Sequence, residues 1–179
     1  MRELKHRRWG SVLLQSACAL LVCLPAFTLP SHAADSVEVQ LQTREAAPRT
    51  VEGPTERAIL RDYRFAWISL TRAFQSNRLD LLEGPFSGEA RRWLTDTVRE
   101  QQGSGLSRRY GPQTHKLEAV FYAPEGDLME LHDTAQYHVE FLDAGKVIGN
   151  RDVVRHFVVL MTPGADRWVI RQLQAVSQF

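Results

Sequence analysis

The sequence predicts an α+β domain in which helices come first and a four-stranded antiparallel sheet follows. Between about residues 54 and 75, apolar residues recur every three or four positions, which is the period of a helix. From about residue 114 the period falls to two, which is the period of a strand, and turn-forming residues divide the remainder into four segments. Helices followed by a run of strands indicate the α+β class.

Residues 1–33 have the three parts of a secretory signal peptide in the right order. Four of the first eight residues are Lys or Arg, residues 11–24 form an apolar run that Pro25 ends, and Ser31 and Ala33 supply the small residues before a cut. The apolar run is shorter than the ~20 residues that span a bilayer core. We therefore expect cleavage after Ala33, no stable transmembrane anchor afterwards, and a protein that is periplasmic or secreted.

Removal of residues 1–33 changes the charge and the cysteine content of the chain. The whole chain has a formal charge of +1, and residues 1–33 carry four Lys or Arg and one Glu, so the mature chain is near −2. A chain without a basic excess is not suited to nucleic acid as a partner. Both cysteines, Cys18 and Cys23, fall in the signal, which excludes a disulfide and a thiol nucleophile from the mature protein.

Residues 34–54 predict a flexible leader or linker. Alanine, proline and glycine at 46–48 and 53–54 interrupt any regular pattern there. Val37, Val39 and Leu41 alternate with polar residues, so a short edge strand is the alternative. The folded domain is expected to cover residues 55–179.

The first helix is expected from about residue 54 to residue 75. Gly53 suits the N-cap, Pro54 suits the first helical position, and Glu56 lies in the first turn, where the helix dipole favours an acid. A broad apolar stripe then follows the helical period. Its members are Ile59, Leu60, Tyr63, Ala66, Trp67, Leu70, Ala73 and Phe74.

A second helix and four strands complete the predicted domain. The helix is expected to begin after Ser87, a good N-cap, and to end at Gly103. The strands are expected at about 114–121, 129–141, 153–161 and 168–176. The second strand is the clearest, because an apolar face alternates with a polar one over its whole length.

This order of elements resembles the nuclear-transport-factor-2-like superfamily. Within it, residues 81–85 (LLEGP), Trp93 and residues 167–170 (RWVI) resemble the intermembrane-space domain of plastid-division regulators, and the chain is similar to small exported bacterial domains of that type. The resemblance covers about residues 55–177. It implies a strongly bent sheet that wraps the first helix as a cone, with ligand pockets between helix and sheet. It implies no single function, since the superfamily includes enzymes, binding modules and assembly domains.

Asp133 is the main candidate for chemistry, because it is a lone acid on an apolar strand face. A buried carboxylate is costly unless it is paired, protonated or beside a wet cavity. If the next hairpin loop has two residues (144–145), Asp133 faces His156, which would be a candidate acid–base couple. If the loop has three residues (143–145), Asp133 faces Arg155 in a structural ion pair. The sequence leaves both registers open, because a shift of one residue exchanges every partner.

Tyr63, Trp67, Tyr137 and Arg155 form the candidate ligand pocket at the open end of the cone. The alternative for the aromatic residues is core packing, with the hydroxyl groups reaching solvent or a backbone group. No cofactor and no metal are expected, because the four histidines after residue 33 supply no evident set of three ligands. The sequence also has no Gly-x-Ser-x-Gly motif and no glycine-rich phosphate loop between a strand and a helix.

Val154, Val158 and Leu160 share one face of the third strand, and the opposite face of that strand is apolar too. Apolar residues on both faces indicate that both faces are covered, whereas the helices cover only one. We therefore expect the outer face to meet a second copy of the sheet or an envelope protein. The alternative is a scatter of surface valines.

The preferred function is a non-catalytic exported domain that binds a partner protein or a small apolar ligand, through the cone or through the outer sheet face. The alternative is a small pocket enzyme of the isomerase, hydrolase or dehydratase type. In that alternative Asp133 and His156 are acid and base, and Tyr63 or Tyr137 donates to an oxyanion.

Overall fold

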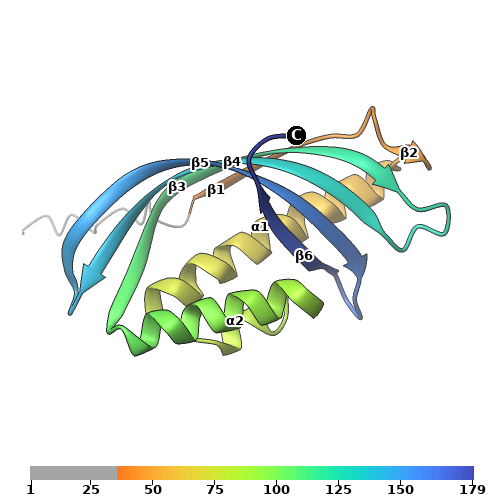
Figure 1. Cartoon of the computed structure of the whole chain (residues 1–179). Helices are drawn as coiled ribbons and strands as arrows, with labels where there is room; N and C mark the ends of the chain where they lie inside the picture. The colour runs from red at the N-terminus through yellow and green to blue at the C-terminus, as the bar shows by residue number, and fades with distance from the viewer. Residues whose placement is uncertain (1–35) are drawn as a thin grey trace, which may run out of the picture. The chain divides into compact units, whose positions relative to one another are not determined.

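A strongly bent sheet arches over two helices that lie on its concave side (Figure 1). The computed structural model describes residues 36–179, so the predicted signal peptide at 1–33 lies outside the described residues. The helices are α1 (Gly53–Ser76) and α2 (Gly88–Gly103), with a 3₁₀ turn at Asp80–Leu82 between them. The strands are β1 (Val37–Gln42), β2 (Ala47–Pro48), β3 (Leu106–Tyr122), β4 (Met129–Asp143), β5 (Lys146–Pro163) and β6 (Trp168–Val176). The predicted α+β class is confirmed.

The sheet has six strands where four were expected. β3 to β6 form the predicted antiparallel meander, and β1 extends it beside β3 in the order β1-β3-β4-β5-β6. β1 and β2 both run parallel to β3. The structure thus has a strand at 37–42, where the sequence favoured a flexible linker and kept a strand as the alternative. Val37 and Val39 are part of the core, and Arg64 of α1 donates a hydrogen bond to the Val37 carbonyl. These contacts explain why residues 37–42 form a strand and not a flexible linker.

Irregular strand pairing moves several side chains from the faces that a strict period of two predicts. In β3 the register shifts between Ala119 and Phe121, so Phe121 leaves the buried face of Leu117 and is partly exposed. Between β5 and β6 another shift places Ile170 and Leu173 together in the core, although a strict period of two places residues 170 and 173 on opposite faces. Such bulges add one residue to one strand and increase its local bend.

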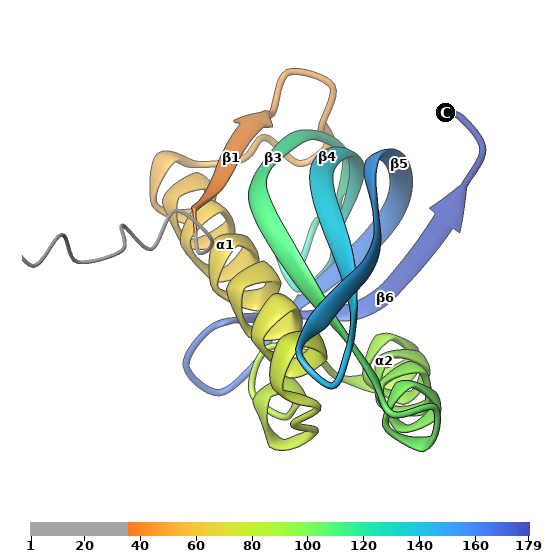
Figure 2. The same ribbon diagram turned by 90° about the vertical axis from the view of Figure 1, so that its left-hand side faces the viewer.

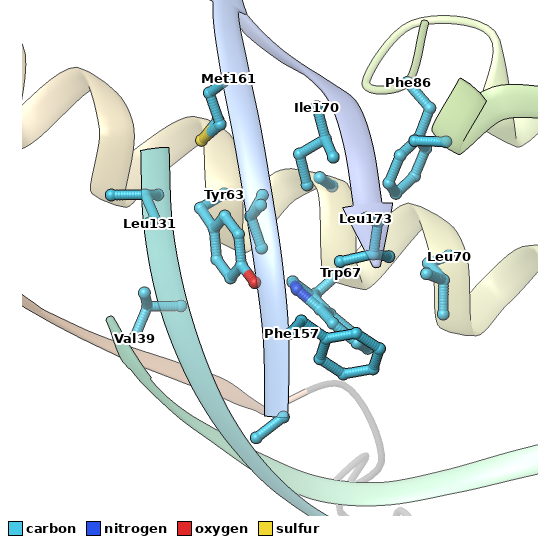
Figure 3. Close-up of a cluster of buried hydrophobic side chains, with 14 of the residues drawn as sticks. Val39, Tyr63, Trp67, Leu70, Phe86, Leu131, Phe157, Met161, Ile170 and Leu173 are labelled. Carbon is cyan, nitrogen blue, oxygen red and sulfur yellow. The ribbon is translucent and has the colours of Figure 1, made fainter. Parts of the chain in front are cut away.

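The core fills the space between α1 and the concave face of the sheet. α1 begins and ends within one residue of the prediction, although its N-cap is Glu52 and not Gly53. Seen from the side, α1 runs along the inside of the arch and α2 lies toward β6 (Figure 2). Side chains from both helices and from β1, β3, β4, β5 and β6 meet in one cluster, which includes Tyr63, Trp67, Phe86, Leu131 and Ile170 (Figure 3).

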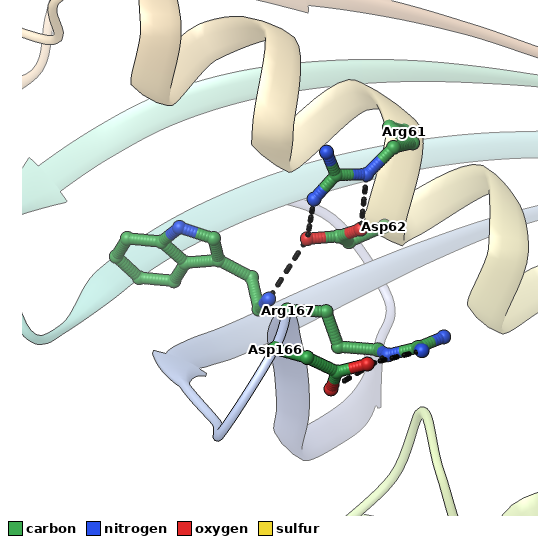
Figure 4. A network of polar contacts seen from close by, with 5 residues as sticks. Arg61, Asp62, Asp166 and Arg167 are labelled. Atoms are coloured by element: carbon green, nitrogen blue, oxygen red, sulfur yellow. Dashed lines mark hydrogen bonds and ion pairs between the residues drawn. The ribbon is translucent and has the colours of Figure 1, made fainter.

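Asp62 connects α1 to the start of β6. Its carboxylate is buried, accepts two hydrogen bonds from the neighbouring Arg61 and accepts a third, 2.8 Å long, from the backbone N–H of Trp168 (Figure 4). A buried N–H that loses its acceptor costs free energy, because it can no longer bond to water either. The contact therefore fixes the β5–β6 turn on the helix.

We predict that Asp62→Ala lowers the free energy of unfolding by about 1–3 kcal/mol, since it leaves the Trp168 N–H without its acceptor. Urea denaturation followed by circular dichroism measures the change. The matched control is Asp166→Ala. Asp166 also forms a two-point contact with an arginine, Arg167, but it is exposed, so its loss should hardly move the midpoint. Equal destabilisation by both variants would contradict this account.

Candidate ligand-binding site

A cavity of about 190 Å³ lies between α1, α2 and the concave face of β3 to β6. Six aromatic side chains line most of it, and the half-exposed Trp93 of α2 lies at its rim. Two of the six come from α1 and the others from β3, β4 and β5: Trp67, Phe74, Tyr110, Tyr137, Phe141 and Phe157. Leu70 and Leu173 close the wall beside Trp67 and Phe157 (Figure 3).

The aromatic wall is continuous because the rings contact one another. The ring centroids of Trp67 and Phe157 are 5.7 Å apart, those of Tyr110 and Tyr137 are 5.5 Å apart, and Phe74 lies 6.3 Å from Tyr110. These separations lie in the range of favourable tilted aromatic pairs. The helical period of α1 and the two-residue period of the strands bring the rings together, since Trp67 and Phe74 are seven residues apart on one helix face.

Three arginines lie among these rings. Arg108 of β3 and both Arg151 and Arg155 of β5 line the cavity. Burial raises the pKa of Tyr110 to about 12, and the charge of Arg108 opposes the rise. Burial also raises the pKa of Tyr137, against the charges of Arg155, Arg151 and Arg108. Both phenols therefore remain neutral at physiological pH and can donate or accept a hydrogen bond.

A separate buried polar group lies behind Trp67. The Tyr63 hydroxyl donates a 2.7 Å hydrogen bond to Oδ2 of Asp133, and Nδ1 of His115 lies 2.9 Å from the same oxygen. All three residues are fully or almost fully buried. Burial raises the pKa of Tyr63 well above its usual value, and the nearby Asp133 adds to that rise. The His115 ring lies tilted against that of Trp67, with the ring centroids 4.3 Å apart, and Trp67 in turn lines the cavity, so Trp67 lies between this group and the cavity.

The structure separates Asp133 from both partners that the sequence suggested. Asp133 pairs with Phe157 on the concave face, while His156 pairs with Thr134 on the outer face and Arg155 pairs with Ala135. The two-residue loop at 144–145 is present, because Asp143 pairs with Lys146. The register then shifts by one residue near Phe141, and this bulge moves every later partner beyond either expectation.

The other predicted site residues divide between the two faces of the sheet. Trp67, Tyr137 and Arg155 line the cavity, whereas the Tyr63 hydroxyl donates its hydrogen bond to Asp133. On the outer face, Val154 is 64% exposed, and Val158 and Leu160 are half-buried. The C-terminal Phe179 stacks on His132 on the outer face, with the ring centroids 4.2 Å apart.

Sequence reasoning assigned fewer than half of the lining residues to a site, and four of the residues that it missed show why. Phe157 lies on the face of the third predicted strand opposite Val154 and Val158, but it was not assigned to a pocket. His115 lies inside the strand expected at 114–121 and in phase with Leu117, but it was not assigned to the inner face, because the apolar alternation begins only at Leu117. Arg108 and Arg151 were missed because β3 and β5 begin seven or eight residues before the predicted starts. Their polar and glycine-containing first halves gave no clear two-residue period.

Comparison with known proteins supports the fold. No family model matches the sequence, and no curated protein matches it. Among the solved structures that resemble the chain is the intermembrane space region of the chloroplast protein ARC6, with 18% identity and a TM-score of 0.53 over 72% of this chain and 98% of that one. ActVI-ORFA from Streptomyces coelicolor also matches, with 17% identity over 69% of this chain and 90% of that one, but its TM-score of 0.31 is too low to support an argument. The chain shares its fold with that intermembrane space region, as the sequence resemblance implied.

Two further properties of residues 36–179 bear on the site. In this part of the chain, no group of three or more His, Cys, Asp or Glu side chains lies close enough together to hold a metal ion. None of the helices described there is long and apolar enough to cross a membrane.

We predict that Tyr63→Phe lowers the free energy of unfolding by about 1–3 kcal/mol, because the buried Asp133 carboxyl loses a hydrogen-bond donor. Urea denaturation measures the loss. Tyr137→Phe is the matched control, since the Tyr137 hydroxyl has no hydrogen bond within residues 36–179 and is only partly buried. If the two variants were equally stable, the Tyr63–Asp133 contact would not hold α1 in place.

Proposed function

We propose that the chain is an exported, non-catalytic binding module that takes a small ligand into the cavity between α1, α2 and the sheet. The observation that carries the proposal is the aromatic cavity itself, which has an open rim at Trp93 and a wall of contacting rings. Concave aromatic hollows with a few polar groups are the usual form of small-molecule sites. The cavity exists without any rearrangement of the fold.

The buried polar group favours binding over catalysis. An acid or base must reach the proton that it transfers. Asp133 is fully buried behind Trp67, and His156 lies on the other face of the sheet, so the two do not form the couple that the enzyme alternative requires. The Tyr63 hydroxyl is likewise occupied by Asp133 and does not line the cavity.

Export is the second part of the proposal. Residues 1–33 have the composition of a signal peptide, and a cut after Ala33 would leave all of residues 36–179 intact, including β1. The ARC6 region with the similar fold is an intermembrane space region, which is a setting outside the cytosol. This likeness supports an exported domain without identifying its ligand.

We predict that the protein purified from its native cell envelope carries an added mass in native mass spectrometry, and that Ala175→Trp removes it. Ala175 lies at the cavity wall and is exposed, so a tryptophan there blocks the cavity at little cost in stability. Occupancy should fall about tenfold or more, as expected when the apolar contacts of a small ligand are lost. The same spectrum reads the cut site.

Gln174→Trp is the control for this experiment. Gln174 precedes Ala175 on β6, is exposed and pairs with Val158 on the outer face. It should leave the added mass in place. A wild-type protein without any added mass, or equal loss in both variants, would argue against a ligand in the cavity.

A homodimer through the outer sheet face is a second proposal, and the exposure of Val154 favours it. This side chain is 64% exposed, and Val158 and Leu160 follow it along the same face of β5. Burial of such apolar side chains against a second copy would stabilise a pair. The neighbouring strand β4 presents mainly polar side chains on this face, so the apolar strip is narrow.

We predict that Val154→Glu shifts a dimer to monomer, since a carboxylate in a symmetric apolar contact meets its own copy. Light scattering after size-exclusion chromatography measures the mass. Ile148→Glu is the control, because Ile148 is similarly exposed but lies near the β4–β5 hairpin, away from the strip. A monomeric wild-type protein, or a dimer in both variants, would exclude this face as the interface.

A further inference from the structure

Charge is distributed unevenly around the cavity. Among its lining residues are Arg108, Arg151 and Arg155, and none is Asp or Glu. Their positions all lie on the concave face, since they pair with Phe141, Val139 and Ala135 across the sheet. An occupant of the cavity therefore meets positive charge and aromatic carbon, with no acid among the lining residues.

None of the three arginines makes an ion pair within residues 36–179. The contrast with Arg109 is informative, because it follows Arg108 directly and points to the outer face. There it forms a 2.6 Å ion pair with Glu140. Glu100 lies near Arg108 in an adjoining hollow, but the two are not paired. The chain thus pairs the arginine outside the cavity and leaves those inside it without a counter-charge.

Aromatic rings orient two of these arginines. The guanidinium of Arg108 lies 4.9 Å from the ring centre of Phe74, and that of Arg151 lies 5.6 Å from the ring centre of Phe141. Stacking uses the flat face of a guanidinium and leaves its N–H groups free in the plane. Those groups match the oxygens of a carboxylate or a phosphate, often in pairs.

The size of the cavity limits the apolar part of an occupant. Its 190 Å³ is comparable with the roughly 150 Å³ apolar cavity that binds benzene in another protein. One ring or a short aliphatic chain fits beside Trp67 and Phe157. A larger apolar body would have to extend past the rim at Trp93.

We propose that the cavity binds a small amphipathic anion, with a carboxylate or phosphate-monoester head at the three arginines and a single ring or short chain against the aromatic wall. This inference rests on the proposed binding function and adds the charge, the head group and the size of the ligand. The arginines supply attraction and direction, and the rings supply the apolar contact.

Isothermal titration calorimetry with three probes tests the inference: octanoate, octyl phosphate and octan-1-ol. The two anions should bind at least about tenfold more tightly than the alcohol, because charge-assisted hydrogen bonds have that strength. The stronger of the two anions identifies the head group. Added salt should weaken the binding of the anions and leave the alcohol unaffected.

Arg151→Gln and Arg155→Gln are the informative variants, since both residues are exposed and neither makes an ion pair whose loss would affect folding. Each should weaken the binding of the preferred anion about tenfold. Lys116→Gln is the control, because it removes an exposed positive charge from the outer face of β3 and should leave affinity unchanged. Thermal melts establish that all three variants are folded.

The outcomes separate the inference from the function on which it rests. If octan-1-ol bound as tightly as the anions and the arginine variants bound like wild type, the anion inference would be overturned while the binding function remained. An equal loss of anion affinity in Lys116→Gln would also overturn the anion inference, since the attraction between protein and anion would then come from net charge alone. If none of the three probes bound, the inference would be overturned, while the added mass in native mass spectrometry would still decide the binding function.

Discussion

The buried contact between Asp133 and Tyr63 is the constraint on which the rest of this structure depends. A lone carboxyl in the middle of an apolar strand face costs several kcal/mol unless donors reach it. The hydroxyl of Tyr63, at 2.7 Å, and His115, at 2.9 Å, reach its Oδ2 from α1 and β3, while Oδ1 has no hydrogen-bond partner within residues 36–179. Their contacts fix the rotation of α1 about its own axis and its position along the sheet. Once Tyr63 is fixed, the helical period directs Trp67 and Phe74 along the concave face, and the wall of the cavity follows.

The fold could be predicted from the sequence to the extent that it follows simple periods. α1, the order of helices and strands, and the inner face of β4 depend on spacing alone, and the structure reproduces them. The register could not be predicted, because it depends on bulges. A single extra residue near Phe141 changes the partner of Asp133, and another near Val120 exposes Phe121. Bulges arise where the curvature of the sheet and its packing over the helix compete, and the apolar periodicity of the sequence does not show where this happens.

The candidate site was predicted in part, for a related reason. Trp67 and Tyr137 are conspicuous apolar positions, so periodicity finds them. Arg108 and Arg151 lie in the first halves of β3 and β5, where charged residues interrupt the apolar residues of the inner face. A charged side chain in such a segment looks like an ordinary surface residue in the sequence. Only the curvature of the sheet, which returns these strand ends toward α1 and α2, makes them part of a cavity.

The polar side chains on the concave face form two separate sets, one that is buried and one that lines the cavity. The acid, the imidazole and one phenol that resemble a catalytic set are buried together and hold the fold. The groups that line the cavity are aromatic rings, guanidinium groups and phenols whose pKa is raised by burial. Trp67 separates the two sets, because one side of its ring contacts His115 while the ring also lines the cavity. The same helix that depends on a buried acid for its position therefore presents aromatic and aliphatic side chains, and not that acid, to the cavity.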